Sequence, residues 1–450
     1  MTYYLDPYGC VKNQVDAENM MAILNESGWT EAKDAGNADL IIVNSCGFIE
    51  SAKKESINAV LIWRKLYPEK KILLAGCLAQ RYAEELPGIL PEADGFFGVA
   101  DLDGIAEAVA KVVGKADDFG VTKTMKTTTD ARQVEIPPGR RPLLSLPGSA
   151  YVKISEGCDN RCSFCAIPLI RGKLKSRTTG DIIEECKNLL GRGIKELCLI
   201  GQDTGSYGLD SSSDGLPGLM GSLSSLGGDF WVRLLYIHPD HFPLPILDIM
   251  ARDKRFLPYF DIPFQHASEK VLKAMNRRGN AESYLELIEM LRQKIEDAVI
   301  RTTFMTGFPG ETEKDFALLL DFQKKAKLDW VGCFAYSREE NTPAYGMKGR
   351  VAKKTANERK RIVEESQISI TEKQMEHFIG RNFNVLVEEK FEPQDPSADE
   401  TSLYLGRLPC QAPEVDGSTV ISTSMPLRTG TIIPCQVIAR AGIDLKAHPL

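Results

Sequence analysis

Strand-like and helix-like segments alternate along most of the chain. In residues 1–113 the apolar runs YYLDPYG, DLIIVNS and KILLAG are typical of buried strands, and helical periodicity follows from Asn13, Glu50 and Gln80. This alternation predicts a parallel sheet covered by helices on both faces. Between Ala150 and Tyr336, helical segments separate most of six further runs: AYVKIS, ELCLIG, WVRLLYI, YFDIP, IRTTFMTG and WVGCFAY. Six β/α units predict an incomplete TIM-like barrel, because a complete one needs eight.

The end of the chain changes to short strands separated by turn residues. The runs FNVLVEEK, SLYLGRL, STVISTS and TIIPCQVIARAGIDLKA predict a small all-β barrel, which follows a polar helix expected near residues 352–378. The Gly/Ser-rich stretch 211–229 is expected to be a loose loop. We therefore expect an α/β multidomain chain, divided into a doubly wound domain (1–114), a linker (115–147), the six-unit barrel (148–378) and the all-β barrel (379–446).

Composition and charge narrow the class of protein. The chain is 43% hydrophobic and 26% charged, and no apolar run reaches the roughly 20 residues of a membrane span. The N-terminus leads directly into a strand rather than a signal peptide, which predicts a cytoplasmic protein. A net charge of −7 argues mildly against a protein that binds phosphate backbones. Eleven cysteines are an odd number, and in a cytoplasmic chain they indicate metal binding or catalysis rather than disulfides.

Three cysteines lie close together in the segment EGCDNRCSFC. Cys158, Cys162 and Cys165 are separated by three and then two residues, directly after the first predicted barrel strand. Thiolates are the usual ligands of iron–sulfur clusters, and three of them leave one iron open for a non-protein ligand. Barrels keep their active sites at the carboxyl ends of strands. The alternatives are a structural zinc site that lacks its fourth ligand, since no histidine is near in sequence to complete it, or three unrelated core cysteines.

Three more cysteines occupy equivalent places in the first domain. Cys10, Cys46 and Cys77 each follow a predicted strand, and ligands of doubly wound sheets bind beyond the carboxyl ends of the strands. This placement predicts a second metal site, with three buried small hydrophobic residues as the alternative. The remaining cysteines are expected in the core or in interfaces: Cys186, Cys198, Cys333, Cys410 and Cys435.

With both triplets in view, the chain resembles the radical-SAM methylthiotransferases over nearly all of its length, including a C-terminal TRAM domain. The resemblance implies two 4Fe–4S clusters, one on Cys158, Cys162 and Cys165 and one on Cys10, Cys46 and Cys77. It also implies S-adenosylmethionine (SAM) as both methyl donor and radical source, and an external electron donor. The first, catalytic triplet would generate a radical that removes hydrogen from the substrate, and the second cluster would supply the methylthio group.

Two branches of this family differ in substrate. The segments NSCGFIESAKKES, GQDTGSYG, YFDIPFQHAS and LPCQAPEVDGSTVIS resemble the branch that modifies the β-carbon of an aspartate in small-subunit ribosomal protein twelve. The alternative is the branch that modifies a tRNA adenosine. Residues 380–446 hold six Lys/Arg and nine Asp/Glu, a net charge of −3, which suits a basic ribosomal protein better than free tRNA. The candidate contact surface is acidic: Glu388, Glu389, Glu392, Asp395, Asp399 and Glu400.

Other polar residues follow predicted barrel strands. Gly201, Gln202 and Asp203 of the GQDT segment are expected to line the SAM pocket, with a simple turn as the alternative. The segment FMTGFPGET is a second candidate for this pocket. Arg171 and Arg177 are expected either to bind a carboxylate or to be solvated. His238 and His266 are expected to be packing residues rather than catalytic ones.

Overall fold

The computed structural model describes residues 1–114, 141–211, 213–391 and 402–450. Its first domain is a five-stranded sheet in the order β2-β1-β3-β4-β5, with every pair parallel. Along β3, Leu40 and Ile42 face one helical layer, and Ile41 and Val43 face the other. This alternation, a consequence of the two-residue period of a strand, confirms the predicted doubly wound sheet. Its elements are β1 (Thr2–Pro7), α1 (Val11–Glu26), β2 (Thr30–Glu31), β3 (Leu40–Ser45), α2 (Glu50–Leu66), β4 (Lys71–Gly76), α3 (Cys77–Arg81), α4 (Leu86–Ile89), β5 (Gly95–Phe97) and α5 (Ile105–Val112).

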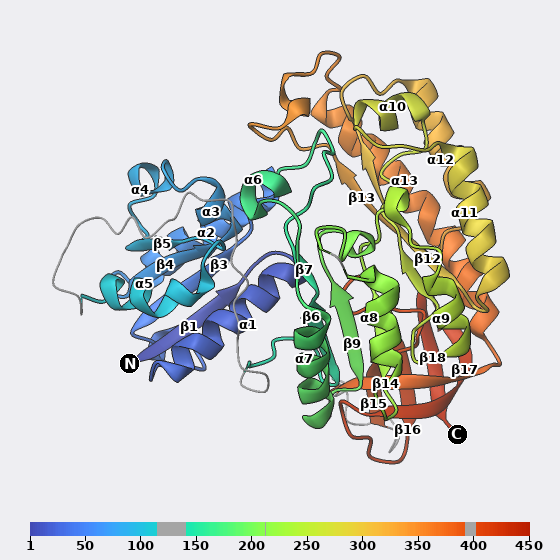
Figure 1. Ribbon diagram of the computed structural model, residues 1–450, viewed down its shortest axis with the longest axis horizontal. Helices are drawn as coiled ribbons and strands as arrows, with labels where there is room; N and C mark the ends of the chain where they lie inside the picture. Colours follow the sequence, from blue (N-terminus) through green and yellow to red (C-terminus); the bar gives the residue numbers. More distant parts are fainter. Residues whose placement is uncertain (115–140, 212, 392–401) are drawn as a thin grey trace.

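The central domain is the predicted incomplete barrel. Two parallel three-stranded sheets, β10-β9-β6 and β11-β12-β13, meet where Val232 pairs with Phe256 just before β11. Helices lie on their outer side (Figure 1). The strands are β6 (Ser149–Lys153), β9 (Glu196–Ile200), β10 (Trp231–Leu234), β11 (Tyr259–Asp261), β12 (Val299–Thr306) and β13 (Trp330–Ala335). The helices are α6 (Ile167–Arg171), α7 (Thr179–Gly191), α8 (Gly215–Ser224), α9 (Ile246–Arg252), α10 (Glu269–Ala274), α11 (Ala281–Lys294), α12 (Glu313–Ala326) and α13 (Lys353–Met375), and β7 (Ser155–Glu156) pairs with β8 (Lys175–Ser176).

One element departs from the prediction. The Gly/Ser-rich stretch 211–229 is not a loose loop, because it contains the ten-residue helix α8. Four of its side chains, Leu216, Leu219, Met220 and Leu223, are buried at helical spacing against the barrel core. That apolar stripe outweighs the low helix propensity of the glycines between them.

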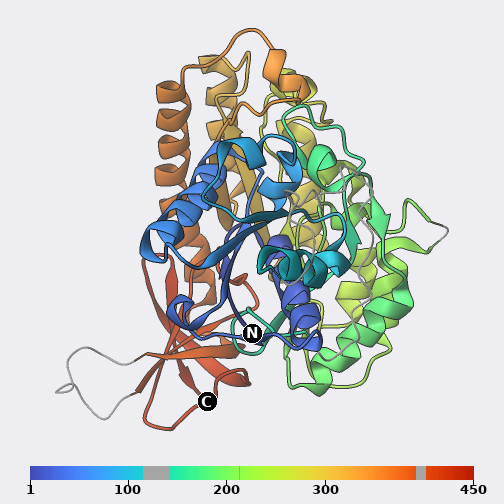
Figure 2. The ribbon, with the colours of Figure 1, turned by 90° about the vertical axis from the view of Figure 1, so that its left-hand side faces the viewer.

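The first domain covers the open side of the barrel. Among the described residues, the first barrel strand β6 and the last barrel strand β13 do not pair with each other. Helix α1 packs against β6. Beyond β13, the backbone N–H of Glu50 donates to Ser337 Oγ at 3.2 Å, and Arg81 and Lys53 form ion pairs with Glu339 at 2.6 and 2.7 Å. Figure 2 shows this domain in front of the barrel. The first domain thus lies where the remaining two β/α units of a complete TIM barrel would be.

The C-terminal domain is a closed five-stranded barrel in the order β14-β15-β16-β18-β17. It lies under the lower end of the central barrel (Figure 1) and contacts residues that open strands: Trp231, Tyr259 and Trp330 pack against Leu386 and Leu408. The Trp330 indole also donates to the Cys410 carbonyl at 2.7 Å. This domain therefore closes the end of the central barrel opposite to the cysteine loop. Its strands are β14 (Asn382–Phe391), β15 (Ser402–Arg407), β16 (Thr419–Thr423), β17 (Ile432–Ala441) and β18 (Asp444–Pro449).

Buried charges join the two barrels. Glu196 accepts hydrogen bonds from Arg233 Nε at 2.7 Å and from Arg407, whose Nε also donates to Glu388 at 2.7 Å. Although burial alone would raise the pKa of Glu196, Arg407 and Arg233 lower it to about 2. The prediction that Glu388 belongs to an acidic surface is wrong, because Glu388 is only 7% exposed and its partner is internal. Glu389 is exposed, and the other proposed surface residues lie outside the described residues: Glu392, Asp395, Asp399 and Glu400.

Replacing Arg407 with methionine is expected to lower the free energy of unfolding by about 3–5 kcal/mol, because Glu388 would stay buried without its partner. Urea denaturation measures this loss. The matched control is Arg440→Met in the same domain, which removes partly exposed pairs with Glu372 and Glu376 at the end of the preceding long helix and should cost about 1 kcal/mol or less. Equal losses in the two variants would contradict a role for the buried network.

None of the helices in the described ranges is both long and apolar enough to cross a membrane.

Candidate active site between two cysteine triplets

The first triplet lies on a loop that leaves β7 and ends in α6. The Cys158 N–H donates to the Gly172 carbonyl at 3.2 Å, and the Cys165 sulfur accepts from the Ile167 N–H at 3.4 Å. Gly157 has a φ of +67°, and a Cβ there would lie 2.0 Å from the Lys173 carbonyl, so only glycine fits this turn. The three thiols, Cys158, Cys162 and Cys165, are free, half-buried and close enough to interact electrostatically.

The second triplet gathers at the carboxyl edge of the first sheet. Cys10 follows β1, Cys46 follows β3 and Cys77 begins α3 directly after β4, and these three strands are neighbours. The Asn13 amide joins their loops by donating to the carbonyls of Tyr8 at 2.7 Å and Ser45 at 3.1 Å. The Cys77 thiol lies 3.6 Å from Asn13 Oδ1. Burial raises the pKa of the Cys77 thiol to about 12.

The two triplets face each other across the domain boundary. Helix α3, which begins at Cys77, packs against α6, which follows Cys165 (Figure 1). Arg171, at the end of α6, donates from Nη2 to Cys77 Sγ at 3.1 Å and to Asp16 at 2.8 Å, and from Nη1 to Glu156 at 2.9 Å. Arg171 is buried, so the alternative of a solvated arginine is wrong. The loop that carries the first triplet therefore contacts a sulfur of the second.

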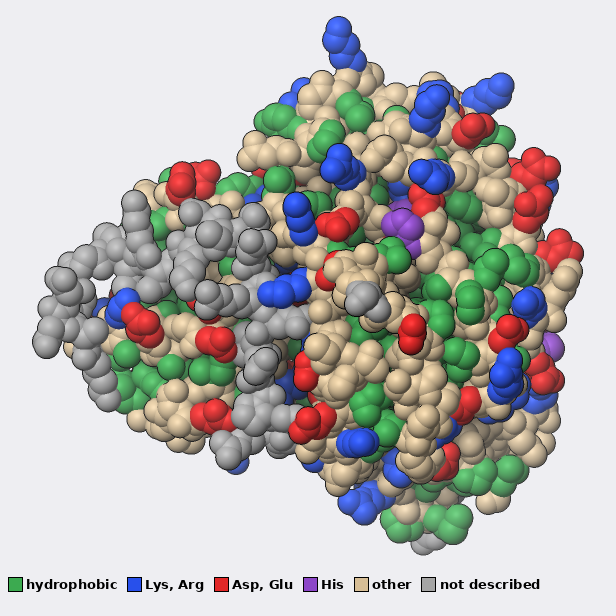
Figure 3. All heavy atoms as spheres, viewed as in Figure 1, with side chains coloured by type: hydrophobic (Ala, Val, Ile, Leu, Met, Phe, Trp, Pro, Cys, Tyr) green, Lys and Arg blue, Asp and Glu red, His purple; other side chains and the backbone are tan. Residues whose placement is uncertain are grey.

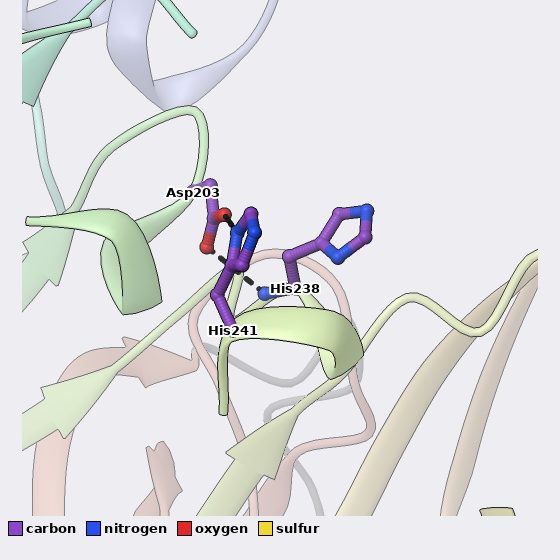
Figure 4. Close-up of side chains that lie close together, drawn as sticks. All are labelled: Asp203, His238 and His241. Carbon is purple, nitrogen blue, oxygen red and sulfur yellow. Dashed lines mark hydrogen bonds and ion pairs between the residues drawn. The ribbon is translucent and has the colours of Figure 1, made fainter. Parts of the chain in front are cut away.

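Asp203 anchors the same loop from the barrel side. Its Oδ2 accepts from Asn160 Nδ2 at 2.8 Å, and Asn160 lies between Cys158 and Cys162. The carboxylate also contacts the His241 ring at 3.0 Å and the His238 N–H at 3.0 Å, while the His238 ring points elsewhere (Figure 4). His238 Nε2 lies 3.9 Å from Cys162 Sγ.

The other predicted polar residues have different surroundings. Gly201 is buried beside Ser155, and Gln202 is half-buried. His266 is buried, and its Nδ1 accepts the N–H groups of Ala267 and Ser268 at 2.9 Å. Arg177 forms a half-buried ion pair with Glu185. The expected contact of Gly201, Gln202 and Asp203 with SAM remains a prediction.

Two buried cations near the triplets form no ion pair with a carboxylate within the described part of the chain, and no sequence motif marks either of them. Arg277 is 6% exposed, and its Nε and Nη2 have no hydrogen-bond partner. Its charge acts on Cys162 and Cys165. Lys12 is 6% exposed, and its Nζ lies 2.9 Å from the centroid of the Tyr236 ring. Burial lowers the pKa of Lys12 to about 8.

The first triplet and its surroundings fit a thiolate-bound cluster with an anionic ligand. A buried guanidinium without a counter-charge is unfavourable, and a negative guest beside the three thiols would remove that penalty. Arg277 provides such a guanidinium next to Cys162 and Cys165. The donor set and the local charge thus agree with the chemistry expected from the spacing of the cysteines.

A pocket of about 430 Å³ lies beyond the second triplet. The loop after Cys46 forms one wall, and the ends of β12 and β13 and the start of α13 form the others. The buried hydroxyl of Tyr336, which lines it, has no hydrogen-bond partner. Lys and Arg side chains project from the upper end of the molecule (Figure 3). The pocket itself is lined by four cations and one acid: Arg338, Arg350, Lys353, Lys360 and Glu50.

Comparison with known proteins identifies the family. Three family models match in succession: Uncharacterized protein family UPF0004 over residues 2–98, the Radical SAM superfamily over 152–322 and the TRAM domain over 379–450. The ribosomal protein uS12 methylthiotransferase RimO of Treponema denticola is 48% identical, with 98% of this chain and 99% of the relative covered. The chain belongs to the RimO family. The RimO protein of Acetivibrio thermocellus is 39% identical over 97% of this chain and 96% of that one.

Membership of the RimO family confirms the predicted radical-SAM methylthiotransferase class. The chain is a transferase, and its family implies SAM and a 4Fe–4S cluster. Solved structures share the fold at low identity. TsrM from Kitasatospora setae, a radical SAM methyltransferase, has a TM-score of 0.55 at 13% identity, with 76% of both chains covered. OxsB, a cobalamin-dependent SAM radical enzyme, has a TM-score of 0.51 at 11% identity, with 81% of this chain and 56% of that one covered.

Proposed function

We propose that this enzyme inserts a methylthio group at the β-carbon of an aspartate in ribosomal protein uS12, using SAM and two 4Fe–4S clusters. The 48% identity to a uS12 methylthiotransferase over nearly the whole chain carries this proposal. The relatives do not favour the tRNA alternative. An external donor would supply the electrons, and the reaction would take place in the cytoplasm, on free uS12 or on the ribosome.

We assign the six cysteines as cluster ligands. Cys158, Cys162 and Cys165 would hold the cluster that works with SAM, and Cys10, Cys46 and Cys77 would hold the second cluster. Gly201, Gln202 and Asp203 would border the SAM side. The corresponding domains are 1–114 for the second cluster, 148–378 for the radical chemistry and 379–446 for the TRAM barrel, with 115–147 as linker.

When bound, these groups supply a radical able to attack an unactivated C–H bond and a transferable methylthio group. The protein supplies position and charge. Asp203 holds the first loop through Asn160, and Arg171 fixes the side chain of Cys77 against that loop. The guanidinium of Arg277 offers a positive charge to an anionic guest. The first domain covers the open side of the barrel and so separates that side from solvent.

The cationic pocket supports an acidic target. It lies at the carboxyl ends of β12 and β13 and borders the loop after Cys46, so a segment of the target protein bound there would lie near the second triplet. Two of its cations, Lys353 and Lys360, pair with Glu50 and Glu364. The two arginines, Arg338 and Arg350, would favour a carboxylate-bearing segment. The TRAM barrel, at the opposite end of the central barrel, would contribute to docking farther from the reaction.

A competition experiment tests the substrate. The reconstituted enzyme is incubated with SAM, a reductant, uS12 and bulk tRNA together, and the products are analysed by mass spectrometry. We expect the mass gain of one methylthio group on an aspartate of uS12. A uS12 variant with that aspartate replaced by alanine is the matched control and should stay unmodified. Modification of a tRNA adenosine with uS12 unchanged would contradict the proposal.

A further inference from the structure

Lys12 occupies an unfavourable position for a cation. It lies in the first turn of α1, a 16-residue helix whose N-terminal turn contains no acidic residue and whose N-cap side chain, Cys10, makes no capping hydrogen bond. The partial positive charge of a helix N-terminus disfavours a lysine at this place. The residue is also 6% exposed, so water does not compensate the charge. The helix N-terminus and the burial both destabilise a charged lysine here. A lysine at such a place indicates a function for its ammonium group.

Neighbouring buried cations form ion pairs, whereas Lys12 forms none within the described residues. Arg171 and Lys153 each form ion pairs with both Asp16 and Glu156. Arg301 pairs with Asp261 and Asp416. Within the described residues, Lys12 forms no ion pair: its closest partner is the face of the Tyr236 ring, and Cys10, Asp261 and Glu156 act on its charge only from a longer range. A cation over an aromatic ring is stabilised, yet its three N–H donors remain available to an anion.

The side chain of Lys12 reaches from the first domain into the barrel. Its helix begins one residue after Cys10, and its Nζ ends at Tyr236, which follows the third barrel strand β10. Tyr236 has a φ of +64°, uncommon for a bulky residue, and its N–H donates to Asp261 Oδ2 at 3.1 Å. Strain of this kind is typical of functional sites. The ammonium thus lies between the second triplet and the carboxyl end of the barrel.

We propose that Lys12 binds the carboxylate of the target aspartate and so selects an acidic side chain. This inference rests on the proposed function. Anions at the two triplets already have cations of their own. Within the described residues, Nε and Nη2 of Arg277 have no hydrogen-bond partner beside the first triplet, and Arg171 donates to a sulfur of the second. A carboxylate on Lys12 would hold the adjoining β-carbon between the two triplets. An adenosine has no carboxylate for this contact.

A double-mutant cycle tests the inference. Binding of uS12 to the reconstituted enzyme is measured by calorimetry, for the wild type and Lys12→Met, with the target aspartate intact or replaced by asparagine. Lys12→Met should weaken binding of the aspartate form about 10- to 100-fold, the range expected for one charged hydrogen bond. The asparagine form should bind equally to both enzymes. Lys12→Arg should recover part of the loss.

Arg141→Met is the matched control. Arg141 is a buried cation that also joins α1 to the barrel region, through Glu18 and Glu185, but it contacts no cysteine. This variant should keep the full preference for aspartate over asparagine. Equal losses for both substrates in Lys12→Met, or loss of the second cluster's iron in both Lys12 variants, would overturn the inference. Modification of tRNA by the wild type would instead refute the proposed function itself.

Discussion

Replacing Cys162 with alanine is expected to abolish reductive cleavage of SAM and to lower the iron content from about eight to about four per chain, as for loss of one of two four-iron clusters. The reason is that Cys162 is the middle ligand of the first triplet, and two thiols cannot hold the cluster that works with SAM. Iron analysis after anaerobic reconstitution and detection of 5′-deoxyadenosine measure the two effects.

Cys186→Ala is the matched control for this variant. Cys186 is a free, fully buried cysteine of α7, so its replacement changes a thiol without changing either triplet. It should retain iron and SAM cleavage. About one zinc per chain in the purified wild type, in place of iron, would contradict the assignment of the triplet.

Replacing Cys46 with alanine should separate the two chemistries. Methylthio transfer is expected to stop, because the second triplet loses a ligand, while SAM cleavage continues because the first triplet is intact. The two products are measured together by liquid chromatography and mass spectrometry. Cys435→Ala, in the TRAM barrel, serves as the control and should turn over normally. Normal methylthio transfer by Cys46→Ala would show that the second triplet is only structural.

Local patterns in the sequence predicted the positions that depend on local structure. Cys10, Cys46 and Cys77 follow strands that are recognisable from their apolar runs, and parallel strands bring their ends to one edge. The glycines of residues 211–229 predict a loop, whereas the spacing of four apolar residues predicts the helix α8 that the structure contains. The fold class therefore followed from periodicity, and the error in secondary structure arose where composition and periodicity disagreed.

Burial and long-range pairing could not be predicted in the same way. The contact of Arg171 with Asp16 joins residues 155 positions apart, so the sequence indicated a carboxylate for Arg171 but not which one. Glu388 looked like part of an acidic surface because charge in a sequence does not reveal burial. The burial of Lys12 and Arg277 is likewise not visible in the sequence. Both residues are distinguished by the lack of an ion pair within the described residues, and only the three-dimensional structure shows this.

The position of the TRAM barrel also affects how substrate and cofactor reach the active site. It covers the residues that open the strands of the central barrel, and the first domain covers the open side. The central barrel is therefore closed at one end and along its open side. The cofactor, the target segment and the reaction products would share the remaining opening, at the carboxyl ends of the strands. Molecules that share one opening must bind and dissociate in sequence. We expect a target segment bound at this opening to block exchange of the cofactor until the segment dissociates.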